Sequence, residues 1–248
     1  MSVAKFTQPI KINAPGKDIV FDGVDFTGKA KIKIISCNSL TLKNCRVYDI
    51  WKDAAPDEQI PFVEALWADS KDGFKLNIEH CFFGENGFYN MINCNQNAPL
   101  FDGSGMNENY FSANCTRDDY FAVYNALDGS VFNFNGNEFE VYTHMGIQIS
   151  IKGNVAATVN FNNNIIGLPA ADIDTVNRGL VRFRPNVKQT ESFENFTINA
   201  SGNVFAGEPD RIAFCHYKET DTHMTEDTLP KYYVDGVLTP MDCFLRED

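Results

Sequence analysis

The chain has 248 residues, which is long enough to bury a substantial core in one large domain or two small ones. It holds 21 Phe but only 2 Trp, together with 26 Asn, and this composition favours strands and turns over helices. The formal net charge of −12 disfavours nucleic acid and anionic lipid as partners, because both are negatively charged.

Neither a membrane span nor a secretion signal is predicted. No stretch approaches 18 apolar residues, and residues 1–12 lack the apolar core of a signal peptide. The 7 Cys form no CxxC or other metal-ligand spacing, which favours free, buried thiols. We therefore expect a protein that is made and kept inside a cell, or that leaves by lysis or with an assembled particle.

The N-terminal segment, residues 1–16, contains QPIKI followed by an Ala-Pro-Gly break. We expect it to supply a strand that covers the first unit of a repeat, as an N-terminal cap or arm. Without such a cover, an open end of stacked strands would invite pairing with other chains.

A short motif recurs through residues 17–217. FNFNGNEF, VNFNNNII and INASGNVF share alternating apolar residues, a Gly or Asn anchor, and a large apolar residue three positions after the anchor. Seven copies have anchors at Gly23, Asn44, His80, Asn107, Gly136, Asn163 and Gly202. Six copies match clearly, whereas the copy around Asn107 matches only at its last aromatic residue, Tyr110.

Each copy predicts a strand with one buried face, followed by a left-handed residue that turns the chain sharply. A second apolar segment lies between anchors, at residues 31–35, 63–67, 88–92, 120–124, 146–151, 179–183 and 211–215. This cycle predicts a coil of parallel strands in which each turn covers the next, about 4.8 Å away.

In such a coil, like residues lie above like residues. Asn137, Asn164 and Asn203 each follow an anchor by one position and therefore predict an Asn ladder. Cys45 and Cys81 occupy the same position in earlier copies, which predicts an inward apolar ladder in the N-terminal half.

The repeat stops after residue 217. Residues 218–230 are polar and predicted to form a loop, and residues 232–241 carry an Asp-Gly turn between apolar runs, which predicts a hairpin. We expect residues 218–248 to be either a C-terminal cap or an arm that packs on a neighbouring subunit.

Through these units the chain resembles the right-handed parallel β-helix proteins of the pectate-lyase and tailspike type, over residues 17–217. The resemblance implies an all-β fold: a single right-handed parallel β-helix of about seven coils, with a short N-terminal cap and a C-terminal tail. That fold hosts lyases, hydrolases, adhesins and virion parts, so it does not select a function.

Two groups of residues are weak catalytic candidates. Asp118 and Asp119 are adjacent carboxylates, but on a strand they point to opposite faces, and the other signatures of polygalacturonase-like hydrolases are missing. Arg182 and Arg184 share one face of a strand in RFRPNVK, which is similar to the basic motif of pectate lyases. A surface ion-pair group, with Asp172 and Asp174 as partners, explains these arginines without catalysis and is the favoured interpretation, and no cofactor or metal site is predicted.

Two long loops are candidates for contact with partners, because insertions between coils often carry function. One spans residues 51–61 and includes Trp51, Asp57 and Glu58. The other spans residues 168–178 and includes Asp172 and Asp174.

The function favoured by these observations is a non-catalytic structural or interaction protein of a bacteriophage particle: a capsid decoration, head fibre or tail spike component. It would be synthesised in the host cytoplasm and reside in the virion. Its partners would be other virion proteins or itself, with a homotrimer implied by the fold group, or a host glycan. The alternative is a polysaccharide-degrading lyase or hydrolase of the tailspike type, and a bacterial surface adhesin is the least favoured option.

Overall fold

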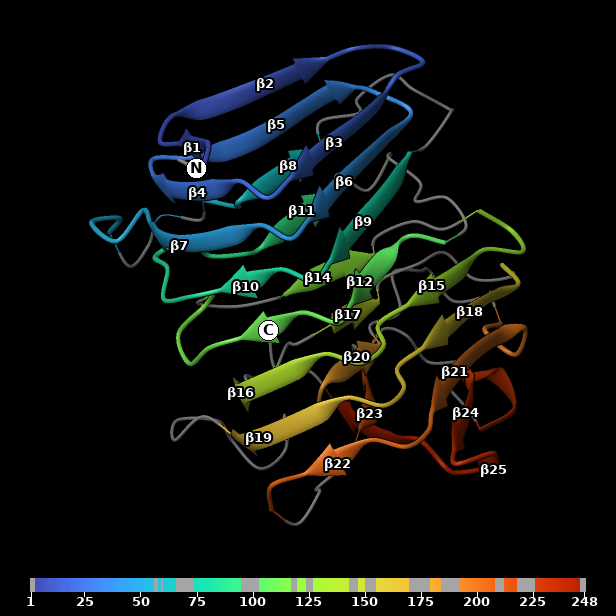
Figure 1. Ribbon diagram of the computed structural model, residues 1–248. Coiled ribbons are helices and arrows are strands. Elements are labelled where there is room, and N and C mark those ends of the chain that lie inside the picture. The colour runs from blue at the N-terminus through green and yellow to red at the C-terminus, as the bar shows by residue number, and fades with distance from the viewer. Residues whose placement is uncertain are drawn as a thin grey trace.

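The computed structural model describes residues 3–55, 58, 60–65, 74–94, 103–116, 120–123, 127–142, 147–149, 155–169, 179–183, 192–207, 212–217 and 226–245. These residues form β-strands and one single-turn 3-10 helix, η1 (Glu226–Thr228), with no α-helix among them (Figure 1). Within this part of the chain, no helix has the length and apolar character needed to cross a membrane.

The strands form four sheets. The eight-stranded sheet contains β1 (Lys5–Phe6), β4 (Asp25–Gly28), β7 (Arg46–Ile50), β10 (Phe82–Phe83), β13 (Tyr110–Phe111), β16 (Glu138–Tyr142), β19 (Ile165–Pro169) and β22 (Val204–Phe205). The nine-stranded sheet contains β3 (Asp18–Asp22), β6 (Ser39–Lys43), β9 (Lys75–Glu79), β12 (Gly105–Asn107), β15 (Val131–Asn133), β18 (Ala157–Asn160), β21 (Phe196–Ala200), β24 (Lys231–Val234) and β25 (Val237–Leu238).

The remaining strands lie on a third side of the molecule. The four-stranded sheet contains β2 (Pro9–Asn13), β5 (Lys31–Ser36), β8 (Val63–Ala65) and β11 (Ile92–Cys94). The five-stranded sheet contains β14 (Phe121–Val123), β17 (Ile147–Ile149), β20 (Val181–Phe183), β23 (Ala213–Tyr217) and β26 (Asp242–Leu245). Since β11 contacts β14, these two sheets follow one another along that side.

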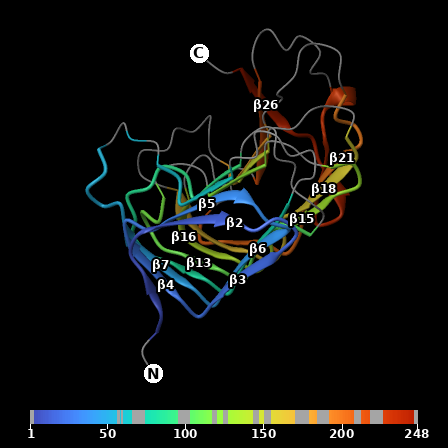
Figure 2. The ribbon, with the colours of Figure 1, turned by 90° about the horizontal axis from the view of Figure 1, so that it is seen from above.

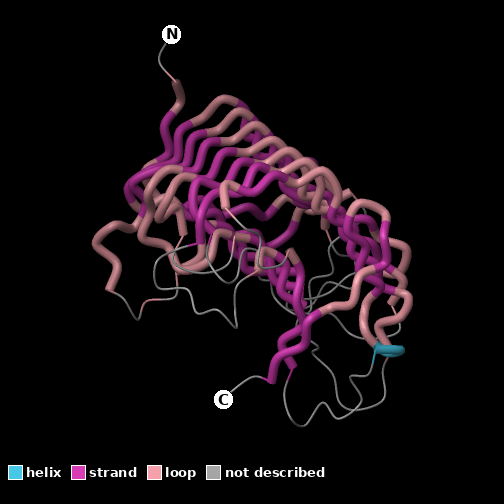
Figure 3. The backbone as a smooth tube through the Cα atoms, turned by 90° about the horizontal axis from the view of Figure 1, so that it is seen from below, coloured by secondary structure: helices cyan, strands magenta, loops and turns pink. Residues whose placement is uncertain are grey.

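The strand order is repetitive: apart from the pair β24 and β25, neighbouring strands in each sheet lie three places apart in the chain. The pairs are parallel, except for the antiparallel hairpin of β24 and β25. Viewed along the stack, the sheets enclose a shared interior, and the tube shows the layers following one another from end to end (Figures 2 and 3). The predicted all-β fold with parallel pairing is confirmed, and the arrangement is compatible with a β-helix.

The interior consists of columns of apolar side chains. Phe83, Phe111 and Phe139 stack in register, with ring centroids 5.0 and 4.9 Å apart and interplanar angles of 14° and 11°. Phe134 and Phe161, which hold the same position in successive copies, are also buried, and the Phe134 amide donates to the Asn160 carbonyl at 2.7 Å. The predicted stacking of like residues through the interior is therefore confirmed.

One copy of the repeat differs from its sequence-based alignment by one residue. The left-handed residue of this copy is Glu108, with φ of 56°, and Asn107 instead ends strand β12 opposite Glu79. As a result Phe111 points inward, while Tyr110 lies on the outer face. The anchor predicted at Asn107 is wrong because Glu rarely adopts this conformation and gives no signal for it.

The termini take part in the same sheets. Strands β1 and β2, inside the segment predicted as a cap, pair with β4 and β5. At the other end, β24 and β26 pair with β21 and β23. The predicted hairpin is confirmed: Asp235 and Gly236 have φ of 47° and 79°, as a two-residue turn between β24 and β25 requires.

Free thiols are also confirmed among the described side chains. Five of them lie in the interior, namely Cys37, Cys45, Cys81, Cys115 and Cys215. Cys243, near the C-terminus, is exposed, which differs from the prediction. It lies on β26, the last strand of its sheet, which has a paired strand on one side only.

Candidate contact surface

One column of outward side chains runs along the eight-stranded sheet, and we call it the outer column. The members lie side by side in the register of the paired strands. Each is followed on its strand by an inward residue, and since side chains alternate along a strand, each member points outward. In order from the N-terminal end, the outer column consists of Lys5, Asp25, Arg46, Phe82, Tyr110, Glu138, Ile165 and Val204.

On either side of Glu138, the middle and the C-terminal end of the outer column hold large exposed apolar side chains. Phe82, Ile165 and Val204 are 41%, 54% and 61% exposed. The ring of Phe82 stacks on that of Tyr110, with centroids 5.6 Å apart and an interplanar angle of 8°. A linear series of large exposed side chains on a rigid sheet is typical of a surface that contacts another molecule.

The N-terminal end of the outer column is basic and tightly bonded. Arg46 holds Asp25 with a two-pronged contact in which Nε donates to Oδ1 at 2.7 Å, and the Tyr48 hydroxyl donates to Oδ2 at 3.1 Å. The Arg46 hydrogen bond, opposed by burial and aided by Tyr48, holds the pKa of Asp25 below its usual value. Lys5 lies 5.8 Å from the centre of the Tyr48 ring.

Acidic side chains follow the aromatic pair. Glu138 and Glu140 lie on the same outward face of β16, two residues apart. The Oε2 atom of Glu140 accepts hydrogen bonds from the Ala113 amide at 2.9 Å and from the Tyr110 hydroxyl at 3.4 Å. Burial, and secondly the negative charge of Glu140, raise the pKa of Tyr110. The face is thus basic at one end, aromatic at its centre and acidic beyond it.

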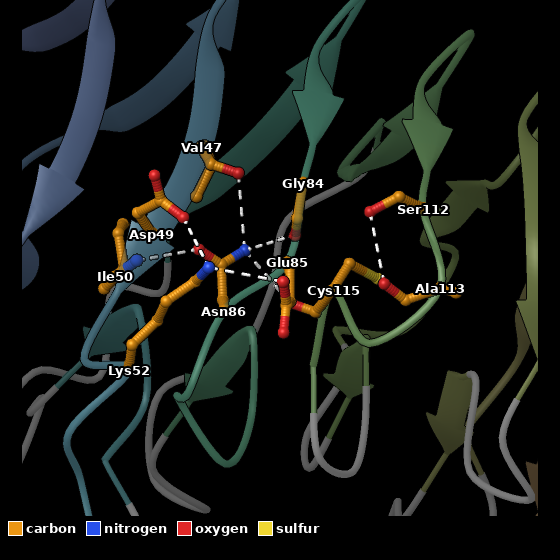
Figure 4. Close-up of polar contacts among 10 residues, drawn as sticks. All are labelled: Val47, Asp49, Ile50, Lys52, Gly84, Glu85, Asn86, Ser112, Ala113 and Cys115. Atoms are coloured by element: carbon orange, nitrogen blue, oxygen red, sulfur yellow. Dashed lines mark hydrogen bonds and ion pairs between the residues drawn. The ribbon is translucent and has the colours of Figure 1, made fainter.

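The predicted contact loop at residues 51–61 starts at the end of β7, where Asn86 fixes the backbone (Figure 4). The Asn86 side-chain amide donates to the carbonyls of Val47, Gly84 and Cys115 at 3.3, 2.7 and 3.2 Å, and its oxygen accepts from the Ile50 amide at 3.0 Å. This one buried side chain ties three successive layers together just before the loop begins.

Trp51 is held rather than presented to solvent. Its indole Nε1 donates to the Ala30 carbonyl at 3.2 Å, and the Lys29 ammonium lies 5.8 Å from the ring centre. A Cβ atom on Gly87 would collide with the Trp51 carbonyl oxygen, so only glycine fits there. These contacts give Trp51 a positioning role at the start of the loop.

An ion-pair group lies beside the same loop. The Lys52 Nζ lies 2.7 Å from Asp49 Oδ1 and 3.2 Å from Glu85 Oε2 (Figure 4). Glu58, also predicted as a contact residue, accepts a hydrogen bond from the Ala55 amide at 3.2 Å. Since all these charges are exposed, they contribute little to stability and remain available for contacts.

Of the predicted catalytic candidates, only Arg182 lies in the described part of the chain. Arg182 lies on β20 between Gln148 and Phe214, and is only 7% exposed, which differs from the surface position expected for it. The other predicted site residues lie outside the described residues: Asp57, Asp118, Asp119, Asp172, Asp174 and Arg184. Among the described side chains, no group of three or more His, Cys, Asp or Glu is arranged to hold a metal ion.

Sequence reasoning missed the outer column. A signal for it exists, because its members from Asp25 onward lie two positions after each left-handed residue. Comparison of the chain with protein-family models, with curated proteins and with solved structures gave no match. The class that the structure defines is therefore a repetitive, parallel β-strand protein, whose most distinctive surface is the outer column.

Proposed function

We propose that the chain is a single right-handed parallel β-helix of about seven coils that acts as a non-catalytic structural protein of a bacteriophage particle, as a capsid decoration, head fibre or tail spike component. The repeated parallel pairing of strands that lie three places apart in the chain supports the coil. Residues 1–16 and 218–248 would be its terminal cap and tail, and the protein would reside in the virion.

The observation that carries this proposal is the outer column. Its exposed Phe82, Ile165 and Val204 stand on a sheet whose inner face is a continuous packed core. Such a face keeps its shape without a partner, so binding costs little ordering entropy. A rigid, elongated face of this kind suits a protein that must bind another particle component along its length.

The test uses particles of the phage that encodes the chain. We expect mass spectrometry of purified particles to detect the protein in stoichiometric amounts. Phe82→Ser and Ile165→Ser should each reduce its incorporation at least tenfold in a complementation assay. Val20→Ser is the matched control, since Val20 is an exposed apolar residue on the nine-stranded sheet. Absence from particles, or equal incorporation of all variants, would contradict the proposal.

A second function is favoured by one specific observation, namely the two carboxylates on the outer face of β16. The strand rise places the backbone positions of Glu138 and Glu140 about 7 Å apart, so two carboxylates project from one face side by side, as two carboxyl groups do in glycoside hydrolases. Release of reducing ends from host polysaccharide by the wild-type chain, abolished in Glu138→Gln, would establish hydrolysis. Unsaturated products would indicate a lyase instead.

A further inference from the structure

The order of charged and aromatic residues along the outer column is complementary to the same order read in the opposite direction. It has eight members, and its midpoint falls between Phe82 and Tyr110. Two levels before the midpoint stands the cation of Arg46, and two levels after it stands the carboxylate of Glu138. Reversing the column therefore sets a basic residue opposite an acidic one and an aromatic residue opposite an aromatic one.

We propose that two copies of this chain pair face to face through their outer columns, with the two stacks antiparallel. The two-fold axis would lie in the interface along the strand direction, between the levels of Phe82 and Tyr110. Phe82 of each copy then faces Tyr110 of the other, and Arg46 faces Glu138. This inference rests on the proposed role of the outer column as a contact surface, and it identifies the partner as a second copy.

The remaining positions also fit this arrangement. Asp25 comes opposite Ile165, and Asp25 presents little charge because it is 5% exposed and bonded to Arg46. Lys5 comes opposite Val204, where its aliphatic stem can cover the apolar side chain. Arg46 uses Nε and Nη2 for Asp25, so Nη1 takes no part in that contact.

The second outward position on each strand supports the same pairing. At the midpoint these positions hold Gly84 and Ser112, which follow Phe82 and Tyr110 by two residues. Small side chains at the centre allow the two sheets to approach closely around the aromatic residues. One level further out, Tyr48 comes opposite Glu140, so a phenol faces a carboxylate.

A parallel arrangement through the same face is disfavoured. If the copies were related by an axis along the stack, as in a trimer, every level would face its own level. Arg46 would then oppose Arg46, and Glu138 would oppose Glu138. Like charges directly opposite each other destabilise an interface and suppress that geometry. The self-complementary order of charges selects the antiparallel pair.

The first experiment measures the oligomeric state by sedimentation velocity over a wide range of protein concentration. We expect the wild-type chain to form a dimer that weakens as salt is raised. Phe82→Ser and Glu138→Lys should each raise the dissociation constant at least tenfold, while the control Val20→Ser leaves it unchanged. A chain that stays monomeric at every concentration, or a dimer insensitive to these changes, would overturn the inference.

The second experiment reads the direction of pairing from disulfide formation. Lys5→Cys and Val204→Cys are each made in a Cys243→Ser background, since Cys243 is exposed. In the antiparallel pair, the thiols introduced at position 5 of the two copies would be about 34 Å apart, far beyond the reach of a disulfide. Under copper-catalysed air oxidation, we expect cross-linking only when the two variants are mixed. Cross-linking of either variant with itself would show parallel pairing and overturn the inference.

The two proposals can fail separately. A monomeric wild-type chain that is incorporated into particles, and loses incorporation through Phe82→Ser, overturns the pairing and retains the particle role. A stable antiparallel dimer that is absent from particles supports the pairing and contradicts the particle role. Folding of each variant is checked by circular dichroism, and Glu138→Lys alters an exposed side chain, so it tests the face without disturbing the core.

Discussion

At the scale of single residues, the interior is specified by a column of amides. The Oδ1 atom of Asn137 accepts hydrogen bonds from the backbone and side-chain nitrogens of Asn109, at 3.1 and 3.0 Å. Asn164 accepts in the same way from Asn137, and Asn203 from Asn164. The predicted ladder is confirmed, and the structure extends it by Asn109. Each amide satisfies groups that would otherwise be buried without partners.

Replacing the central amide should therefore be costly. In Asn137→Ala, the two nitrogens of Asn109 lose their acceptor, and the side-chain donor to the Met106 carbonyl disappears. We expect a loss of about 2 to 4 kcal/mol in the free energy of unfolding, measured by urea denaturation. The exposed Asn38→Ala serves as control and should change stability by less than about 0.5 kcal/mol. Equal stability of the two variants would show that the ladder is not stabilising.

The contact between Asp25 and Arg46 predicts a pH dependence. Because the pKa of Asp25 is lowered on folding, its stabilising effect is complete above the pKa of the unfolded chain, about 3.9. That contribution is lost as the pH falls through the lower folded pKa. The fall in melting temperature between about pH 5 and about pH 2.5 should therefore be smaller in Asp25→Asn than in the wild type. An identical fall in both proteins would rule out this linkage.

At the scale of strands and turns, the inward apolar positions and the strands that carry them could be predicted from the sequence, because the core requires them in every layer. Inward positions must be apolar in each copy, so their period is visible, and each of the seven second segments overlaps a strand. The members of the outer column from Asp25 onward keep a constant position, two residues after each left-handed residue, but no residue type recurs there, because their chemistry differs from level to level. The position of the turn at Glu108 was not predicted for a related reason. The strands on either side impose the left-handed conformation there, so the residue type does not indicate it.

This turn predicts a stabilising substitution. Glu108 has φ of 56°, a conformation that costs a non-glycine residue about 1 kcal/mol and that Asn tolerates better. Its contact with His80, at 3.1 Å, is exposed and contributes little. We expect Glu108→Asn to raise the free energy of unfolding by about 0.5 kcal/mol, and Gly136→Ala, at the next turn, to lower it by about 1 kcal/mol. Thermal unfolding measures both changes in the free energy of unfolding, and two changes of the same sign would contradict the prediction.

At the scale of the whole molecule, the stack has two ends, and they are built differently. The N-terminal end begins with the parallel strands β1, β2 and β3. At the C-terminal end, the hairpin of β24 and β25 reverses the chain, so the nine-stranded sheet ends in an antiparallel strand. An antiparallel last strand offers a different hydrogen-bond pattern from the layers above it, which hinders continued parallel stacking by a further chain.

The last layer should accordingly act as a cover. Ending the chain after residue 230 removes β24 and β26, which leaves β21 and β23 as open edges. It also removes Tyr232, which is 5% exposed and packs in the core. We expect the truncated chain to melt at a lower temperature and to aggregate, as light scattering would detect. The double variant Val237→Asp, Leu238→Asp keeps both pairings and changes only exposed side chains, so it should remain dispersed. A truncated chain that is as stable and as dispersed as this control would show that the last layer is not needed as a cover. Each layer would then need a neighbouring layer on one side only.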